Sequence, residues 1–310
     1  MKILVTGGAG FIGSHVADAL VGAGHEIHVI DDLSAGKIDN VSGDVTFHQY
    51  DIRSPEASRL FDEHRYEALV HLAAQMDVRR SVADPRFDAD VNVGGILNLM
   101  EAGRKTGLKK VVFSSTGGAI YGEPEYVPQD EGHPVQPISP YGITKLTTEK
   151  YLYFYQQAYG IDFVALRYGN VYGPRQNPHG EAGVIAIFIK RLVSGDPVMI
   201  YGDGEQTRDY VFVEDVARAN MAALDHEGSG TFNIGTAVET TVNELFAVIR
   251  DRIAPSTSGS YAPARVGEQM RSVLDYGLAE RVLGWSPEVG IHEGLLRTVD
   301  WFSAVEENRN

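Results

Sequence analysis

Residues 2–13 read KILVTGGAGFIG, and this stretch decides the fold. Residues 2–6 form a short apolar run, which is typical of a buried parallel strand. Glycines then follow at the spacing G-x-x-G-x-x-G, and residues with helical periodicity come next. Glycine permits a turn with positive φ and lets an anion approach the backbone, while a helix N-terminus supplies free N–H groups. The stretch therefore predicts a pyrophosphate-binding loop that contacts a dinucleotide through Gly7, Gly10, Phe11, Ile12 and Gly13.

Strands and helices alternate outward from this loop through the first half of the chain. Apolar runs predict further strands at 26–30, 45–50, 68–72, 110–115 and 163–167, and helical periodicity covers 92–105. This alternation predicts an α/β fold, a doubly wound parallel sheet of the Rossmann type with a smaller C-terminal lobe. We expect a dinucleotide-binding domain from residues 1–166 and about 210–235. Residues 167–209 and 236–310 are expected to form a substrate-binding lobe, with the substrate between the two parts.

The composition excludes several classes of protein. With 27 Lys and Arg against 42 Asp and Glu, the net charge of −15 repels phosphate backbones, so no nucleic-acid partner is expected. The chain of 310 residues contains no Cys, which excludes disulfide scaffolds, thiolate metal sites and Cys nucleophiles. His, Asp and Glu show no metal-ligand spacing along the sequence, so no metal is predicted. No apolar run approaches the ~20 residues of a membrane span. Because Met1–Val5 enters a strand without a leader, we expect a cytoplasmic protein.

Acidic residues end two of the expected strands. Asp31 and Asp32 follow the second strand, where a carboxylate hydrogen-bonds the ribose 2′-hydroxyl of a dinucleotide and repels a 2′-phosphate. This position favours NAD over NADP. The alternative is that Asp31 and Asp32 are ordinary solvated loop residues without a ligand. Asp51 and Ile52 follow the third strand, and we expect them beside the adenine.

A tyrosine and a lysine lie at the start of a predicted helix, within Ser139-Pro140-Tyr141-Gly142-Ile143-Thr144-Lys145. Tyr141 and Lys145 are four residues apart and therefore share one helix face. A phenol titrates near ~10, and a neighbouring ammonium and a positively charged nicotinamide both favour the phenolate. Tyr141 is thus the candidate general base, worth about 10²–10⁴-fold in rate, with Lys145 as its partner. Both are also candidate cofactor contacts; a surface pair without function is the alternative for this spacing alone.

These features together resemble the extended short-chain dehydrogenase/reductase family. The resemblance rests on the glycine loop, the acidic strand end, Leu72-Ala73-Ala74-Gln75 and the Tyr141-x-x-x-Lys145 pair. Within that family, Ser115-Thr116-Gly117-Gly118-Ala119-Ile120-Tyr121-Gly122 is similar to the UDP-glucose (UDP-galactose) 4-epimerases, and the similarity covers essentially the whole chain. It implies NAD as the cofactor and a UDP-sugar as the substrate. It also implies cofactor contacts at Leu72, Ala73, Ala74, Gln75 and Ser114.

The third catalytic residue is assigned on the same resemblance. A hydroxyl at the end of the 110–115 strand can hydrogen-bond the reacting oxygen of the sugar. Thr116 lies 25 residues before Tyr141, which is the spacing typical of the family. Thr116 is therefore the candidate, as a catalytic and substrate-binding residue, and Ser115 is the reserve.

Several residues of the second half resemble the UDP-sugar contacts of the family. In Arg167-Tyr168-Gly169-Asn170, Asn170 would reach the diphosphate and Tyr168 would lie near the nicotinamide. The residues expected to border the uracil are Val184, Ile185 and Tyr201. Arg208 and Arg265 would clamp the diphosphate and Glu268 would reach the ribose, which suits the bidentate chemistry of guanidinium. A salt bridge to an acidic residue is the alternative for each arginine.

One further position bears on which sugars fit. In the family, the residue seven positions after the arginine seen here as Arg265 acts as a size gate beside the 2-substituent of the sugar. That residue is Ser272, whose small side chain leaves room for an acetamido group. We therefore expect N-acetylhexosamines to be accepted together with the parent sugars. The alternative is that Ser272 is a loop residue and another side chain closes the pocket.

The sequence as a whole indicates an NAD-dependent UDP-sugar 4-epimerase that works through a transient 4-keto sugar. A 4,6-dehydratase needs an acid/base pair after the hydroxyl residue, where Gly117 and Gly118 stand. A UDP-glucuronate decarboxylase or epimerase remains an alternative, as does a non-catalytic NAD-binding sensor, although such proteins tend to lose the Tyr or the Lys. The resemblance also implies a homodimer formed by the 92–105 helix and by the helix that carries Tyr151-Leu152-Tyr153-Phe154-Tyr155. Packing within one chain is the alternative for that aromatic run.

Overall fold

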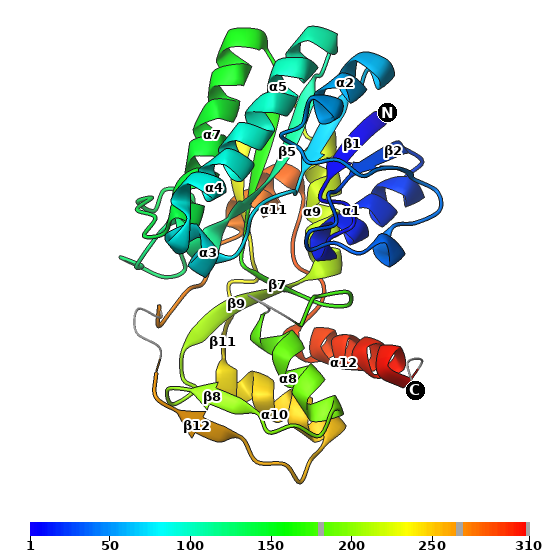
Figure 1. Cartoon of the computed structure of the whole chain (residues 1–310). Coiled ribbons are helices and arrows are strands. Elements are labelled where there is room, and N and C mark those ends of the chain that lie inside the picture. Colours follow the sequence, from blue (N-terminus) through cyan, green and yellow to red (C-terminus); the bar gives the residue numbers. More distant parts are fainter. Residues whose placement is uncertain (179–182, 265–268, 308–310) are drawn as a thin grey trace.

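The computed structural model describes residues 1–178, 183–264 and 269–307. Seven parallel strands form a single sheet in the order β10-β6-β5-β4-β1-β2-β3 (Figure 1). Their bounds are β1 Lys2–Thr6, β2 Glu26–Ile30, β3 Thr46–His48, β4 Ala68–His71, β5 Lys110–Thr116, β6 Asp162–Tyr168 and β10 Gly230–Ile234. The order runs outward in both directions from β1 and β4, so the doubly wound fold is confirmed and its topological switch point lies between these two strands.

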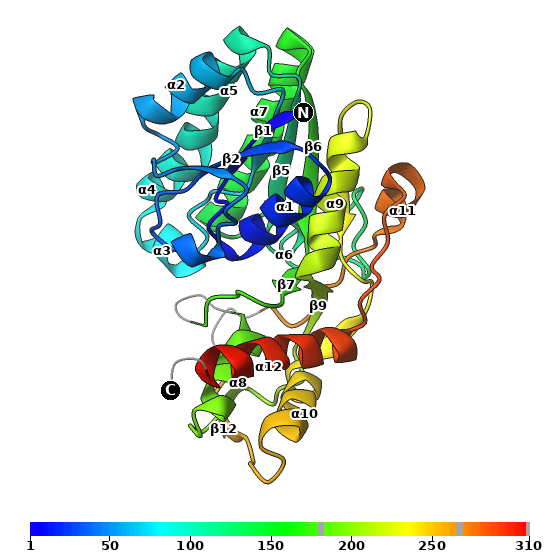
Figure 2. The ribbon, with the colours of Figure 1, turned by 90° about the vertical axis from the view of Figure 1, so that its right-hand side faces the viewer.

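Helices cover both faces of this sheet, because most of the buried side chains of its strands are apolar and need a partner layer (Figures 1 and 2). One face carries α1 Phe11–Gly22, α9 Val213–Asp225 and α11 Gly277–Leu283. The other face carries α2 Pro55–His64, α5 Gly95–Thr106 and α7 Pro140–Tyr159. Leu20 and Val216 bury the first face, and Phe61, Leu99 and Leu152 bury the second.

Short elements connect these helices at the carboxyl edge of the sheet. They are η1 Ile38–Asn40, α3 Val78–Ala83, α4 Pro85–Ala89, the π-helix η2 Asp90–Gly94 and α6 Gly117–Ile120. The helix expected from residue 92 therefore begins with a π-helical turn that places Asn92 in its interior. The helix predicted to begin within residues 139–145 is α7, and Ser139 caps it, because its hydroxyl accepts the N–H of Gly142 at 3.1 Å.

The second half of the chain builds a smaller lobe below the carboxyl edge (Figure 1). Its elements are β7 Asn170–Tyr172, α8 Val184–Val193, β8 Met199–Tyr201, β9 Thr207–Phe212, β11 Glu239–Thr241, α10 Val242–Ile253, β12 Ser260–Ala262 and α12 Ile291–Glu307. A capping box starts α10, with Thr241 and Glu244 each accepting the other's backbone N–H. Ile189, Phe246 and Val299 form a core separate from those of the large sheet.

One segment departs from the expected division of the chain. The sequence predicts residues 236–310 in the lobe, yet α11 packs against α9 and β10 on the large sheet. Ala279 and Trp285 are buried there, and the Trp285 indole donates to the carbonyl oxygen of Asp215 at 2.9 Å. The chain therefore returns to the large domain once more before α12 enters the lobe. Within the described residues, none of the helices combines the length and apolar character that crossing a membrane requires.

Candidate active site

The glycine loop joins β1 to α1 at the switch point of the sheet. Gly7 has a φ of +71°, and a Cβ there would lie 2.7 Å from the backbone nitrogen of Ala73. A Cβ on Gly13 would lie 2.1 Å from the Gly7 carbonyl oxygen, so both positions require glycine. Gly10 caps α1 without any side-chain hydrogen bond, which leaves the N–H groups of Phe11 and Ile12 in the first turn to meet an anion. The loop therefore fits a pyrophosphate.

The two acidic residues after β2 have different surroundings. Asp31 is 8% exposed, and its carboxylate accepts the backbone N–H groups of Ala9 at 3.0 Å and Leu33 at 2.8 Å. Burial raises the pKa of Asp31, and these two hydrogen bonds oppose that rise. Asp32 is exposed and accepts from the N–H and hydroxyl of Ser34. Asp31 is thus held beside the glycine loop, where a ribose would lie, and Asp32 faces outward.

The pair after β3 is tied to other side chains. Arg53 holds the Asp51 carboxylate at 2.5 Å and also contacts Asp90 at 2.6 Å. This pairing lowers the pKa of Asp51. Ile52 is 5% exposed and packs against Gly95 of α5. Of these two predicted adenine contacts, Asp51 is the one that keeps an accessible side chain.

The segment after β4 is fixed by hydrogen bonds beside the glycine loop. The N–H of Ala73 donates to the Thr6 hydroxyl at 3.1 Å, and the preceding Leu72 donates to the Thr6 carbonyl at 3.1 Å. The Gln75 side chain donates to Asp88 at 2.9 Å, and its oxygen accepts the N–H of Asp77 at 2.8 Å. Leu72, Ala73 and Ala74 therefore present backbone at the switch point, whereas the side chain of Gln75 is engaged within the protein.

Tyr141 and Lys145 lie on consecutive turns of α7, as their spacing predicts. The Lys145 ammonium donates to the Ser114 carbonyl oxygen at 2.7 Å and lies 5.8 Å from the centre of the Tyr141 ring. Burial lowers the pKa of Lys145 to about 8, against the opposing effect of Asp88. Burial also raises the pKa of Tyr141, and the Asp88 charge raises it further. The Tyr141 hydroxyl has no hydrogen-bond partner among the residues that the structure describes, so its proton is available to a ligand.

The hydroxyl residues of β5 divide by their contacts. Ser115 is 3% exposed, and its hydroxyl donates to Glu149 at 2.6 Å. Thr116 ends the strand with a partly exposed side chain that makes no hydrogen bond within the described part of the chain. This difference favours Thr116 over Ser115 as the group that meets a substrate. The Ser114 side chain hydrogen-bonds Tyr168, which is 4% exposed and also accepts from Asn220 at 2.8 Å.

Two buried carboxylates below this site were missed by the sequence analysis. Asp88 is 0% exposed, and its oxygens accept from Gln75 and from Thr144 at 2.9 Å each. Glu149 binds Arg167 at 2.7 Å, and both side chains are nearly inaccessible. Two spacings in the sequence could have indicated these residues. Glu149 follows Lys145 by four residues on the same helix, and Asn92 follows Asp88 by four.

The lobe supplies residues from two paired strands. Asn170 of β7 pairs with Tyr210 of β9, two residues from Arg208, so the backbones at 170 and 208 lie about 8 Å apart. Asn170 is exposed. The Arg208 guanidinium donates to the Thr207 carbonyl at 2.8 Å and pairs with no carboxylate among the described residues. The two side chains can thus meet one diphosphate.

The remaining predicted substrate contacts have varied positions. Val184 begins α8 and is partly buried, Ile185 is 1% exposed in the lobe core, and Tyr201 at the end of β8 is 38% exposed. Ser272 is 3% exposed. The next residue but one, Leu274, packs against Gly117, directly after Thr116. Arg265 and Glu268 lie outside the described residues.

The fold places the phenol of Tyr141, the ammonium of Lys145 and the hydroxyl of Thr116 at the same edge of the sheet as the N-terminus of α1, which can bind an anion. Lys145, Ser114 and Thr116 link α7 to the end of β5, three strands from the acidic end of β2. A dinucleotide lying across the switch point from Asp31 would place its reactive ring near Tyr141. This constellation suits removal of a hydroxyl proton coupled to hydride transfer.

Comparison with known proteins gives a consistent result. A profile of the NAD dependent epimerase/dehydratase family matches residues 3–235. The chain is 46% identical over 308 residues to the UDP-glucose 4-epimerase of Mycolicibacterium smegmatis, which covers 97% of this chain and 98% of that protein. The crystal structure of the Thermotoga maritima UDP-glucose 4-epimerase with UDP-glucose has a TM-score of 0.96 and 49% identity, covering 99% of this chain and 100% of the other. The Thermus thermophilus UDP-glucose 4-epimerase in complex with NAD has a TM-score of 0.91 and 47% identity, covering 97% and 99%.

Proposed function

The chain belongs to the NAD dependent epimerase/dehydratase family, and from this premise we propose that it is an NAD-dependent 4-epimerase that interconverts UDP-galactose and UDP-glucose. One observation supports this most directly. The Tyr141 hydroxyl, which has no hydrogen-bond partner among the described residues, lies one helical turn from Lys145, whose ammonium is fixed on the Ser114 carbonyl near the end of β5. The UDP-glucose 4-epimerases named above, at 46% to 49% identity, support the same activity.

The geometry of the glycine loop fits the pyrophosphate of NAD. Gly7 and Gly13 have no room for a Cβ, and the uncapped start of α1 offers N–H groups to a pyrophosphate. Asp31 would hold the ribose hydroxyls, and Ser114, Tyr168 and Lys145 would surround the nicotinamide. Bound NAD supplies the hydride acceptor and donor and is restored in each turnover.

Proton movement is the task of the protein's own residues. We assign Tyr141 as the base that takes the proton of the sugar 4-hydroxyl on its phenolate oxygen. Because burial raises the pKa of this phenol in the protein alone, the phenolate depends on the positive charge of a bound nicotinamide together with that of Lys145. Lys145 stabilises that phenolate, and Thr116 donates a hydrogen bond to the reacting oxygen. Asn170 and Arg208 hold the diphosphate while the 4-keto sugar turns to expose its other face, and Tyr141 then returns the proton. Val184, Ile185 and Tyr201 would border the uracil, with Arg265 and Glu268 on the diphosphate and ribose.

Gly117 and Gly118 argue against the dehydratase chemistry of the same family. They begin α6 immediately after Thr116, and a residue without a side chain cannot transfer a proton. A Cβ on Gly117 would lie 2.5 Å from the Leu274 side chain, so this position has no room for an acid/base group. Chemistry at the sugar C4 alone therefore fits this end of β5.

The experiment that tests the function is incubation with UDP-galactose and no added NAD. We expect UDP-glucose to appear, and we expect Tyr141→Phe to lose turnover by about 10²-fold or more while it still binds UDP. Tyr153→Phe, at a 57% exposed position of the same helix, is the matched control and should keep the wild-type rate. No product from wild type in a panel of UDP-, dTDP- and GDP-sugars would reject the epimerase proposal, and conversion of UDP-glucuronate alone would favour the related enzymes of that substrate.

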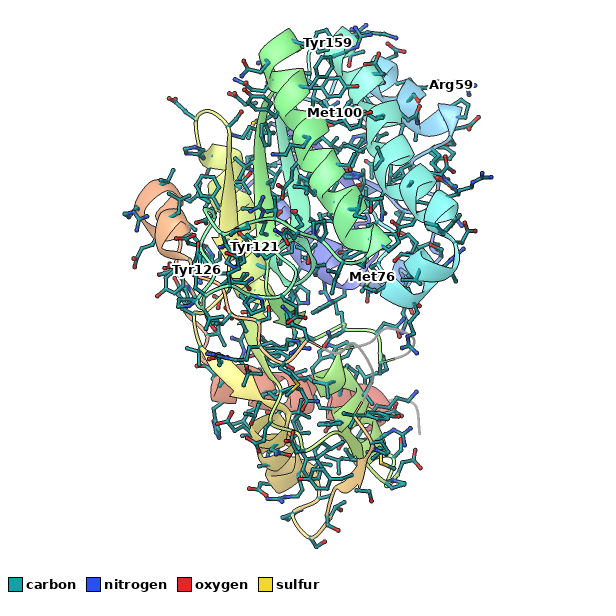
Figure 3. All side chains as sticks on the ribbon, turned by 90° about the vertical axis from the view of Figure 1, so that its left-hand side faces the viewer. Arg59, Met76, Met100, Tyr121, Tyr126 and Tyr159 are labelled. Atoms are coloured by element: carbon teal, nitrogen blue, oxygen red, sulfur yellow. The ribbon has the colours of Figure 1, made fainter. Side chains whose placement is uncertain are left out.

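We further propose a cytoplasmic homodimer in which α5 and α7 pair with their copies. These helices run side by side on one face of the molecule, where Tyr159 is labelled at the end of α7 (Figure 3). Ile143, Tyr151 and Phe154 share one stripe of α7 and are 51%, 40% and 50% exposed. An exposed apolar stripe of this kind is typical of an interface between subunits.

A further inference from the structure

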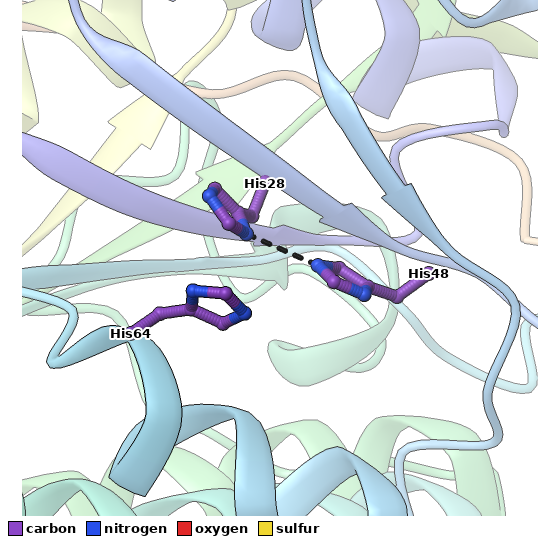
Figure 4. A group of neighbouring side chains, drawn as sticks. All are labelled: His28, His48 and His64. Carbon is purple, nitrogen blue, oxygen red and sulfur yellow. Dashed lines mark hydrogen bonds between the residues drawn. The ribbon is translucent and has the colours of Figure 1, made fainter.

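Three histidines from separate elements meet at the edge of the large sheet. His28 lies within β2, His48 ends β3, and His64 ends α2. Figure 4 shows their rings gathered around one space, with His64 reaching from the helix toward the pair on the strands. They are 20 and 16 residues apart along the chain, so only the fold brings them together.

The ligand atoms of these rings are close enough for one ion to reach them all. One ring nitrogen from each histidine lies within 4.8 Å of the other two. His28 Nδ1 is 3.0 Å from His48 Nε2 and 3.0 Å from the Tyr66 hydroxyl. The His64 ring centre is 4.4 Å from that of His28. Zinc–imidazole bonds of ~2.0–2.1 Å place tetrahedral ligand atoms about 3.4 Å apart, so a modest rotation of His64 completes the set.

The exposure of His28 and His64 fits a site in which the His64 ring rotates to bind the ion. His28 is 4% exposed and is held between the strands and Tyr66. The His64 side chain is 29% exposed at the last turn of α2, so it can rotate without disturbing the core. The two strand residues His28 and His48 are therefore already in place, and rotation of His64 on α2 would supply the third ligand.

Carboxylates lie near the Nε2 atoms of His28 and His64. His28 Nε2 lies 3.6 Å from Glu26, and His64 Nε2 lies 3.9 Å from Glu63. Glu26 thus lies on the side of the His28 ring opposite the cluster, where a carboxylate can orient a metal-bound imidazole and increase its basicity.

We propose that His28, His48 and His64 bind one divalent late first-row metal ion, Zn²⁺ in the first place, with water or the Tyr66 hydroxyl as the fourth ligand. Imidazole nitrogen suits Zn²⁺, Cu²⁺ and Ni²⁺ better than the hard cations, which prefer oxygen. The ion fastens the short edge strand β3 to β2 and to the end of α2. Three strand spacings separate β2 from β5, about 14 Å, so its role is structural and separate from the chemistry at Tyr141.

The test uses the full untagged chain with NAD bound, stripped of metal with a chelator and then titrated with Co²⁺ and Zn²⁺. We expect one equivalent of Co²⁺ to develop the visible absorption of a four-coordinate site and Zn²⁺ to displace it. At a hundredfold excess of free Zn²⁺ over its Kd, Tm should rise by about 5 °C. His64→Gln and His48→Gln should each weaken binding by at least about tenfold, and they avoid the most buried ring.

The matched control is His292→Gln, which removes an exposed histidine on α12. Its affinity and Tm shift should equal those of wild type. Wild-type binding no tighter than that of the His48→Gln/His64→Gln double variant would overturn the proposal, since the metal would then bind elsewhere or only weakly. A cluster that serves packing alone would lose stability on substitution but would show no saturable Zn²⁺-dependent rise in Tm in wild type.

Discussion

At the scale of single residues, we expect Asp31 to determine which dinucleotide the site accepts. Its carboxylate is almost inaccessible and is held by two backbone N–H groups, so it cannot swing away from a 2′-phosphate. Asp31→Asn keeps the shape and removes the charge. We expect the preference for NAD⁺ over NADP⁺, measured as the ratio of their Kd values, to fall by about tenfold, or ~1.4 kcal/mol.

Asp32→Asn is the control for this change, because Asp32 faces outward and bonds Ser34. It should leave the ratio unchanged. If the Asp31 variant, and then the double variant, keep the wild-type ratio, the carboxylate is not the determinant of cofactor choice.

Ser272 is the residue that we expect to set substrate breadth. It is held in place because its neighbour Val273 accepts the N–H of Gln129 at 2.8 Å and Leu274 packs on Gly117 beside Thr116. Wild type should interconvert UDP-N-acetylglucosamine and UDP-N-acetylgalactosamine as well as the parent sugars. Ser272→Tyr should lose the N-acetyl pair by about 10²-fold, since the ring overlaps the acetamido group, and should keep UDP-galactose.

Product analysis of both sugar pairs by chromatography measures this breadth, with Ser272→Ala as the control that keeps all four substrates. A wild-type enzyme without any activity on the N-acetyl pair would reject the size gate and leave the 4-epimerase proposal standing.

The sequence motifs place Tyr141, Lys145 and Thr116 on adjoining elements, as the structure has them, because their spacing is local to one helix and one strand. The surroundings of these residues depend on long-range contacts and were missed. Asp88 reaches the site only because α4 and the π-helical turn place it beneath α7. Residues 28, 48 and 64 show no metal-ligand spacing in the sequence, and strand pairing is what assembles them.

At the scale of elements, the pairing of β7 with β9 aligns Asn170 and Arg208. Because the Arg208 guanidinium has no carboxylate partner among the described residues, its loss should be felt mainly by a bound anion. Arg208→Ala should raise KM for UDP-galactose by about 10- to 100-fold, the effect of one charge-assisted hydrogen bond. NAD binding should not change.

Arg271→Ala provides the comparison, since Arg271 is paired with Glu239 at 2.6 Å on the neighbouring strand. Its KM should stay within about twofold of wild type, in line with the small effect of exposed ion pairs. Equal effects of the two substitutions in steady-state kinetics would indicate that general charge, and not a specific diphosphate contact, is responsible.

Strand and helix positions in the first half were predicted well from apolar runs, because buried parallel strands are apolar on both faces. The exact bounds differ where tertiary contacts decide. The strand expected over 45–50 narrows to β3, an edge strand, and the helix from 92 opens with a π-helical turn. Lobe elements such as β8 and β12 span three residues each and carry too little periodicity to be recognised.

At the scale of the whole molecule, the α5 and α7 face should hold two subunits together. A double substitution Tyr151→Arg/Phe154→Arg places two charges on the stripe and should convert the dimer to monomers. Sedimentation velocity measures the change. The control Tyr261→Arg changes a still more exposed aromatic residue of the lobe, and this variant should remain dimeric. Monomeric wild type would contradict the assembly.

The position of β10 has a consequence for how the chain folds during synthesis. This strand completes the sheet beside β6, yet it leaves the ribosome only after β7, α8, β8 and β9 have been made. Until residue 234 emerges, β6 presents an open edge of unpaired backbone groups, a feature that favours association between nascent chains. Maturation of the nucleotide-binding half therefore has to wait for translation of the first four elements of the lobe, and truncated chains that end before β10 should be prone to aggregate.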